Sequence, residues 1–111
     1  MTTHRTPADV LRAMGERIAT PERWTQLTSA RTPDGVGVGP MHPEAVCWCW
    51  LGALDAELGC DSARRKGVVS LMAAAVDIQP KFVGFWNDTH THAEVLEANA
   101  RALTMAEQDE R

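Results

Sequence analysis

The first regular pattern along the chain is a set of apolar residues at helical spacing. Leu11, Met14 and Ile18 lie three and four residues apart, so they share one face of a helix. Thr6, which is followed by proline and then by an acidic residue in the first turn, is a typical N-cap. The pattern predicts a helix that begins after Thr6 and ends near Thr20.

The next segment has strand and turn signals rather than helical periodicity. The run from Trp24 to Ala30 favours an extended chain, and the Thr-Pro-Asp-Gly turn sequence follows at 32–35. A glycine-rich run, Gly35–Gly39, then provides a weak return strand. We expect a small hairpin or an irregular loop here.

A second helix is predicted over Glu44–Leu58, closed by a glycine. Bulky side chains, Trp50 among them, fall on one broad face of this helix, and small ones, including Cys49 and Gly52, fall on the opposite face. A helix that is apolar on two sides is expected to be buried, and its small face allows a neighbouring backbone to approach closely.

Two more helices and a connector follow. The third helix is capped by Asp61 or Ser62 and extends until Pro80. The connector, Lys81–Asp88, is rich in aromatic and β-branched residues and is expected to be a short strand or a buried extended segment. The last helix starts at Thr91, where the sequence has capping-box spacing.

The last helix is expected to end near Met105, before a polar tail that frays. It carries two polar residues where apolar ones are expected: Asn99 in the middle of the apolar stripe, and His92 one turn before Val95. A buried amide is costly unless it is hydrogen-bonded, so we expect Asn99 to bind another segment, with the connector at 86–88 as the candidate.

These elements predict a mainly α fold: a compact bundle of about four helices around a central buried helix, with a small hairpin or irregular loop between the first two helices. The 111 residues, 44% of them hydrophobic and 23% charged, fit one domain spanning 1–111, with an ordered core at about 6–105.

Charge and cysteine content narrow the class of protein. A net charge of −4 makes nucleic-acid binding unfavourable, and the basic cluster Arg64-Arg65-Lys66 is expected to be a solvated helix face. We expect neither a membrane span nor a secretory leader, because no apolar run is long enough. Three cysteines, an odd number, fit a reducing compartment, so a cytoplasmic location is expected.

The pair Cys47 and Cys49 resembles a metal or redox motif. In a continuous helix, residues two apart point in opposite directions, so the pair becomes possible only if the helix begins near Cys49. Adding His42 and Cys60 gives no recognised zinc spacing. A site made of His90, His92 and a cysteine is a lower-ranked hypothesis. We therefore expect no metal site and no cofactor.

Three short motifs carry a resemblance to a known family. Residues 49–54 read C-W-L-G-A-L, residues 86–88 read W-N-D, and residues 94–96 read E-V-L. In this order they resemble a small family of bacterial and phage proteins of unknown function, over roughly Ala8–Met105. The extra Cys47 and the tryptophans around it depart from the pattern. The resemblance implies no activity, but it indicates Cys49 rather than Cys47 as the cysteine of interest.

Two functional hypotheses follow. The first is a small non-catalytic binding or regulatory module, because the sequence has no phosphate-binding loop, dinucleotide motif or nucleophile elbow. Trp48, Trp86 and Asn99 are then the candidate binding residues, since tryptophan is frequent at binding hot spots. The partner is an unknown protein or small molecule, and the sequence does not fix the oligomeric state.

The second hypothesis is a thiol-dependent hydrolase or transferase. Cys49 would be the nucleophile and His92 the base, with Asn87 or Asp88 orienting the imidazole. Such a nucleophile needs a lowered pKa, which a nearby helix N-terminus favours. Burial of Cys49 against the small face of the predicted helix argues against it.

Overall fold

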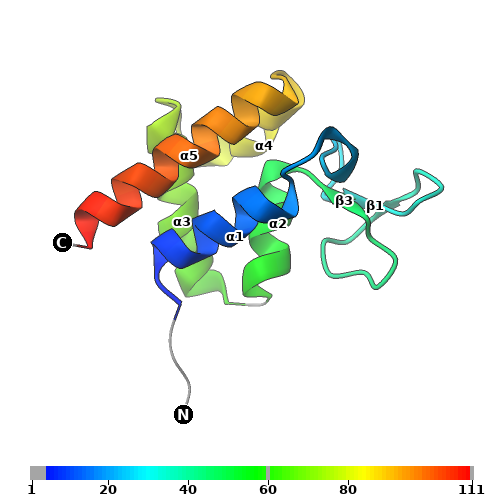
Figure 1. Cartoon of the computed structure of the whole chain (residues 1–111), viewed down its shortest axis with the longest axis horizontal. Helices are drawn as coiled ribbons and strands as arrows, with labels where there is room; N and C mark the ends of the chain where they lie inside the picture. Colours follow the sequence, from blue (N-terminus) through cyan, green and yellow to red (C-terminus); the bar gives the residue numbers. More distant parts are fainter. Residues whose placement is uncertain (1–4, 60, 111) are drawn as a thin grey trace, which may run out of the picture.

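The first and last helices of the chain pack side by side and lie across the second and third helices (Figure 1). The computed structural model describes residues 5–59 and 61–110. Over these residues the five α-helices are α1 (Pro7–Arg17), α2 (Trp50–Leu58), α3 (Ser62–Ala75), α4 (Val83–Asp88) and α5 (His92–Asp109). The radius of gyration, 13.1 Å, is that of a compact domain of this length. The predicted compact, mainly helical fold is confirmed.

The helix starts that rest on capping residues are confirmed. The side chains of Thr6 and Thr91 each accept a hydrogen bond from the backbone N–H three residues later. The acidic side chain at that later position accepts a hydrogen bond from the backbone N–H of the cap, so both form capping boxes. Asp61, one of the two predicted caps, accepts from the N–H of Arg64 at the start of α3. Gly59, with φ of +65°, ends α2 as predicted.

The predicted hairpin is present but is part of a slightly larger sheet. Strand β1 (Ala30–Arg31) pairs antiparallel with β2 (Gly37–Val38) across the predicted turn. Its other edge pairs antiparallel with β3 (Cys47–Trp48), a strand that the sequence analysis did not identify. This three-stranded sheet, with its long loops, projects to the right of the helices in Figure 1. We refer to residues 24–48 as the β lobe.

The predicted start of the second helix is wrong. Residues 47–48 are extended, and α2 begins at Trp50 rather than at Glu44. The backbone N–H of Val46 and the N–H of Cys49 bind carbonyls of the β1 region, so this segment completes the sheet before the helix begins. The apolar residues at 45–49 therefore alternate as in a strand, and the helical wheel drawn through them does not apply.

The prediction of an extended connector at 81–88 is also wrong. A 3-10 turn, Pro80–Phe82, leads directly into α4. Phe82, Phe85 and Trp86 are spaced three and four residues apart, a helical pattern that their high strand propensity obscured. The third helix ends at Ala75, earlier than predicted, because Asp77 takes a positive φ of 58° before Pro80.

The last helix extends beyond its predicted end. It reaches Asp109, and its final residues contact α1 instead of fraying: Arg12 pairs with Glu107 at 3.1 Å, and Glu110 accepts from the N–H of Ala8. In the described residues no single helix is long and apolar enough to cross a membrane; α3 and the segment after it meet that test only together, as a pair bent by 82°.

Candidate functional site

Asn87 is the polar centre of the region where the candidate residues gather. Its side chain is fully buried, and Oδ1 accepts hydrogen bonds from Trp24 Nε1 at 2.8 Å and from the Trp50 backbone N–H at 3.0 Å. Its Nδ2 donates to the Thr25 carbonyl at 3.2 Å and to Asp88 Oδ1 at 3.1 Å. Asn87 therefore joins the β lobe, the start of α2 and α4 through four hydrogen bonds.

The neighbouring polar residues extend this network along the chain. Asp88 Oδ1 accepts from the N–H of Leu27 at 2.8 Å, which holds Leu27 at an unusual positive φ of 72°. Gln26 Nε2 lies within hydrogen-bond distance of the carbonyls of Asn87, Asp88 and His90, nearest to His90 at 2.9 Å. We call these contacts between residues 24–27 and 87–90 the Asn87 network. In this network Asn87 and Asp88 have a structural role.

Cys49 is the N-cap of α2. Its Sγ accepts a hydrogen bond from the N–H of Gly52 at 3.2 Å, and the residue is 7% exposed. Burial raises the pKa of the Cys49 thiol, and the hydrogen bonds from Gly52 and Leu51 only partly oppose this effect. The thiol is thus protonated at neutral pH, the opposite of what a nucleophile requires.

Gly52 lies where the backbone of a neighbouring segment comes close to α2. A Cβ at this position would lie 2.0 Å from the Ser29 carbonyl oxygen, and that oxygen also accepts from the N–H of Cys49. The close approach of a neighbouring backbone, expected from the small residues of this helix, is therefore present, and the neighbour is the β lobe.

His92 has a structural contact of its own. Its Nε2 lies 2.7 Å from the Ile18 carbonyl oxygen. Because a carbonyl can only accept, Nε2 carries the hydrogen and donates a hydrogen bond to this group at the C-terminus of α1. The ring also packs against Trp24, with centroids 5.6 Å apart. Among the hydrogen bonds of the described residues none joins His92 to Cys49 or to Asn87. The structure brings the four candidates into one region but does not align them as a nucleophile, a base and its orienting group.

The cysteine pair does not form a metal centre in the part of the chain that is described. Cys47 lies in β3 with Sγ 4.0 Å from the Arg31 carbonyl, and Cys47 and Cys49 are both free thiols. Within residues 5–59 and 61–110 there is no cluster of three or more His, Cys, Asp or Glu side chains that could hold a metal ion. Cys60 lies outside the described residues.

Trp48 lines an open pocket between α1 and the β lobe, with a volume of about 460 Å³. Its Nε1 donates to the Pro40 carbonyl at 2.9 Å, and the Arg17 guanidinium lies 4.6 Å from the ring centroid. Glu57 holds Arg17 at 2.8 Å and Arg5 at 2.7 Å. Burial raises the pKa of Glu57, but the hydrogen bonds and charges of these two arginines outweigh it and hold the pKa below its usual value.

Trp86 lies beside a second pocket, on the surface of α4. The ring stacks on His90, with centroids 3.9 Å apart and planes 16° apart, and its other neighbour is Trp50 at 5.4 Å. The pocket has a volume of about 520 Å³, and we call it the α4 pocket. Its lining residues are largely apolar: Ile78, Phe82, Phe85, Trp86, Thr89 and His90.

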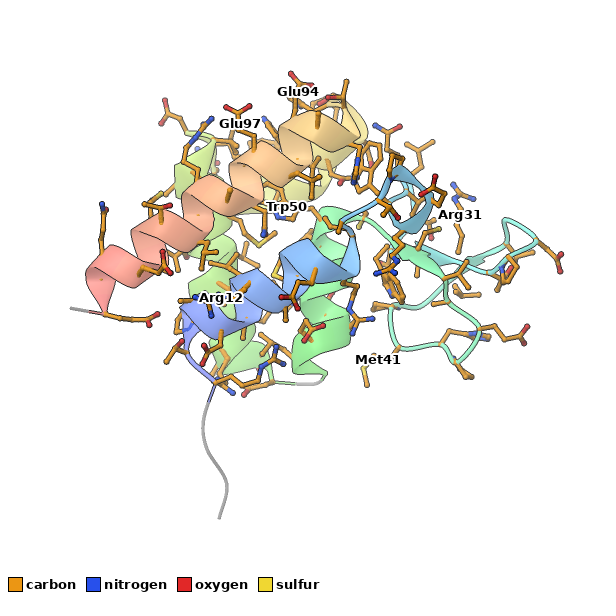
Figure 2. All side chains as sticks on the ribbon, in the orientation of Figure 1. Arg12, Arg31, Met41, Trp50, Glu94 and Glu97 are labelled. Carbon is orange, nitrogen blue, oxygen red and sulfur yellow. The ribbon has the colours of Figure 1, made fainter. Side chains whose placement is uncertain are left out.

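Asn99 is part of the interior rather than of a surface. It is buried, its Oδ1 accepts from Trp50 Nε1 at 3.0 Å, and its Nδ2 donates to the Leu11 carbonyl at 2.9 Å. Figure 2 shows Trp50 enclosed by α1, α2 and α5. The prediction that Asn99 binds another segment is confirmed, but its partners lie in α1 and α2 and not in the candidate segment 86–88. Asn99 is only 4% exposed and its Oδ1 and Nδ2 both have protein partners, so its contacts are those of a structural residue.

Two exposed aromatic side chains, Phe82 and Phe85, were not predicted from the sequence as binding residues. They are 46% and 69% exposed, although the connector that contains them was expected to be buried. Their three-residue spacing directly after Pro80 was the available signal, because it places both rings on one face of a short helix.

Comparison with known proteins agrees with the resemblance noted in the motifs. A protein-family model described as a family of unknown function, DUF6197, matches residues 2–104. No curated protein and no solved structure matches the chain.

Proposed function

Because the chain belongs to DUF6197, a family to which no function is assigned, we propose a function from its surface: a non-catalytic module that binds a partner protein through the α4 pocket. The occupant is a short apolar segment of that partner. The proposed setting is the cytoplasm of a bacterial or phage-infected cell, which the free thiols of Cys47 and Cys49 support.

The observation that carries this proposal is the exposure of Phe82 and Phe85 beside an open pocket. Water contact with two phenylalanine rings is unfavourable, and covering the exposed part of each would contribute about half to two-thirds of the roughly 1.5–3 kcal/mol of full burial, before the cost of association. Adjacent exposed aromatic side chains on a monomer are typical of interaction surfaces. The rings also flank Trp86, which was identified from the sequence as a candidate binding residue.

The state of the candidate catalytic groups supports a binding role over the thiol-enzyme alternative. Cys49 is a buried cap with a raised pKa, His92 donates to a backbone carbonyl, and Asn87 is fully hydrogen-bonded. A nucleophile and a base need access to substrate and to each other. Neither condition is met by these contacts.

The test is selection of peptides on the wild-type protein from a phage-displayed library of random sequences. We expect apolar peptides that bind the wild type and lose at least tenfold in affinity for Phe85→Ser. Val36→Ser is the matched control, because Val36 is also exposed (59%) but lies on the β lobe. Peptides that bind both variants equally, or no enriched peptide at all, would overturn the proposal.

A further inference from the structure

A further pocket lies near the α4 pocket and has a basic lining, and we call it the basic pocket. It lies between α3 and the 3-10 turn Pro80–Phe82 and has a volume of about 760 Å³. Arg65, Lys66 and Lys81 line it, and among its lining residues in the described chain none is acidic. Arg65 is already paired with Asp55 at 2.6 Å, so the two lysines are the cations that face this pocket without that neutralising contact.

The position of these lysines is unusual for the chain as a whole. The sequence contains only two lysines, Lys66 and Lys81, and both line this one pocket, although the protein carries a net charge of −4. A local positive site on an acidic molecule attracts negative groups selectively, because the remaining surface repels them.

The basic pocket and the α4 pocket are lined by consecutive residues of the chain. Lys81 lines the basic pocket, while the next residue, Phe82, lines the α4 pocket. The Lys81 Nζ lies 5.2 Å from the Phe82 ring centroid. A single bound segment can therefore place apolar side chains against Phe82 and Phe85 and a negative group beside Lys81.

A small polar pocket shares two lining residues with the α4 pocket. Trp86 and His90 border both, and Glu94 and Glu97 line the polar pocket together with Arg101. Figure 2 shows Glu94 and Glu97 on the outer face of α5. Glu97 is paired with Arg101 at 2.9 Å, which leaves one glutamate, Glu94, beside the polar pocket against the two lysines of the basic pocket.

We propose that the occupant of the α4 pocket is an acidic amphipathic segment of a partner protein, with its carboxylates over Lys66 and Lys81 and its apolar side chains on Phe82 and Phe85. This inference rests on the proposed function and adds the charge of the partner. A single-stranded nucleic acid is a poorer fit, because it needs open ring faces for stacking. Here His90 covers one face of Trp86, and Lys81 lies over Phe82.

The test uses the peptides selected on the wild-type protein. We expect them to contain Asp or Glu next to their apolar residues and to bind the double variant Lys66→Gln/Lys81→Gln about fivefold more weakly, since two exposed ion pairs are lost. Arg23→Glu is the control: it changes the net charge by the same amount, is exposed, and lies beside the Trp48 pocket. This control should bind as the wild type does.

Acetylation of amines gives an independent readout, because the chain has only two lysine side chains. Bound peptide should slow acetylation of Lys66 and Lys81, measured by mass spectrometry. Peptides that require Phe85 but lack acidic residues, or that ignore the double variant, would overturn this inference and leave the proposed function intact. Absence of any peptide that requires Phe85 would overturn both. Binding of single-stranded DNA or anionic vesicles that requires Phe85 and both lysines would overturn the choice of partner.

Discussion

Asn87 links three parts of the molecule, so its replacement should affect stability more than any contact on the surface. Asn87→Ala leaves the part-buried Trp24 Nε1–H and the buried Trp50 N–H without their acceptor. We expect a loss of about 3 kcal/mol in the free energy of unfolding, measured by urea denaturation with circular dichroism. Gln79→Ala, at an exposed position, should change it by less than about 0.5 kcal/mol. A loss for Asn87→Ala no larger than that of the control would contradict the role of the network.

Cys49 should react slowly for a cysteine. Because burial raises its pKa, carbamidomethylation by iodoacetamide at neutral pH should be slower in the folded protein than in urea, read site by site by mass spectrometry. A rate faster than that of free cysteine would revive the thiol-enzyme hypothesis.

The same raised pKa predicts a pH dependence. The folded state holds the Cys49 proton more tightly than the unfolded state, so this group's contribution to stability is complete below about pH 8.5 and is lost as the pH rises above it. The stability of the wild type should therefore fall more steeply in mild alkali than that of Cys49→Ser.

At the level of single residues, the sequence identified side chains that lie in the same region of the fold, but it did not predict the groups that they bind. Asn87, Asp88, His92 and Cys49 were selected for chemistry, and they do gather in one region. Their partners are mostly backbone groups and tryptophan N–H groups from distant segments. Such partners leave no spacing signal in the sequence, so a structural network and a catalytic site look alike before the fold is known.

Among the elements, the contact between α2 and the β lobe can be tested by one substitution. Gly52→Ala improves helix propensity, but its Cβ would lie 2.0 Å from the Ser29 carbonyl oxygen. We expect the free energy of unfolding to fall by about 2 kcal/mol or more, because the backbone must shift.

Gly67→Ala is the matched control, because it lies within α3 and its Cβ would meet nothing within 4 Å. It should stabilise the protein by up to about 1 kcal/mol. If both variants are stabilised in thermal denaturation, the close approach of Ser29 to α2 is incorrect.

Element boundaries were predictable where the chain carries its own stop or start signal. Thr6, Thr91 and Gly59 are such signals, and their helices begin or end there. Cysteine is not a usual cap, so Cys49 gave no sign that α2 starts after it. The three strands are two residues each, and their pairing depends on segments far apart in the sequence. Local patterns therefore could not locate β3.

For the whole molecule, burial is very unequal between the helices and the β lobe. Between residues 24 and 48 only Ala30 and Cys47 are buried. Such a region opens at low free-energy cost. We expect thermolysin, which cleaves before apolar residues, to cut first before Val36 or Met41, both more than half exposed. First cuts within α1 or α5, identified by mass spectrometry, would contradict this; Val36→Ser/Met41→Ser should slow the cleavage.

The packing of α1 on α5 has a consequence for synthesis in the cell. The buried face of α1 includes Leu11 and Met14, and α5, the last of the five helices to be made, packs against this helix. A growing chain therefore leaves the ribosome with an apolar helix that α2 and α3 cover only in part until α5 emerges. Folding has to wait for that moment, and during the delay the nascent chain is the form most exposed to aggregation and most dependent on chaperones.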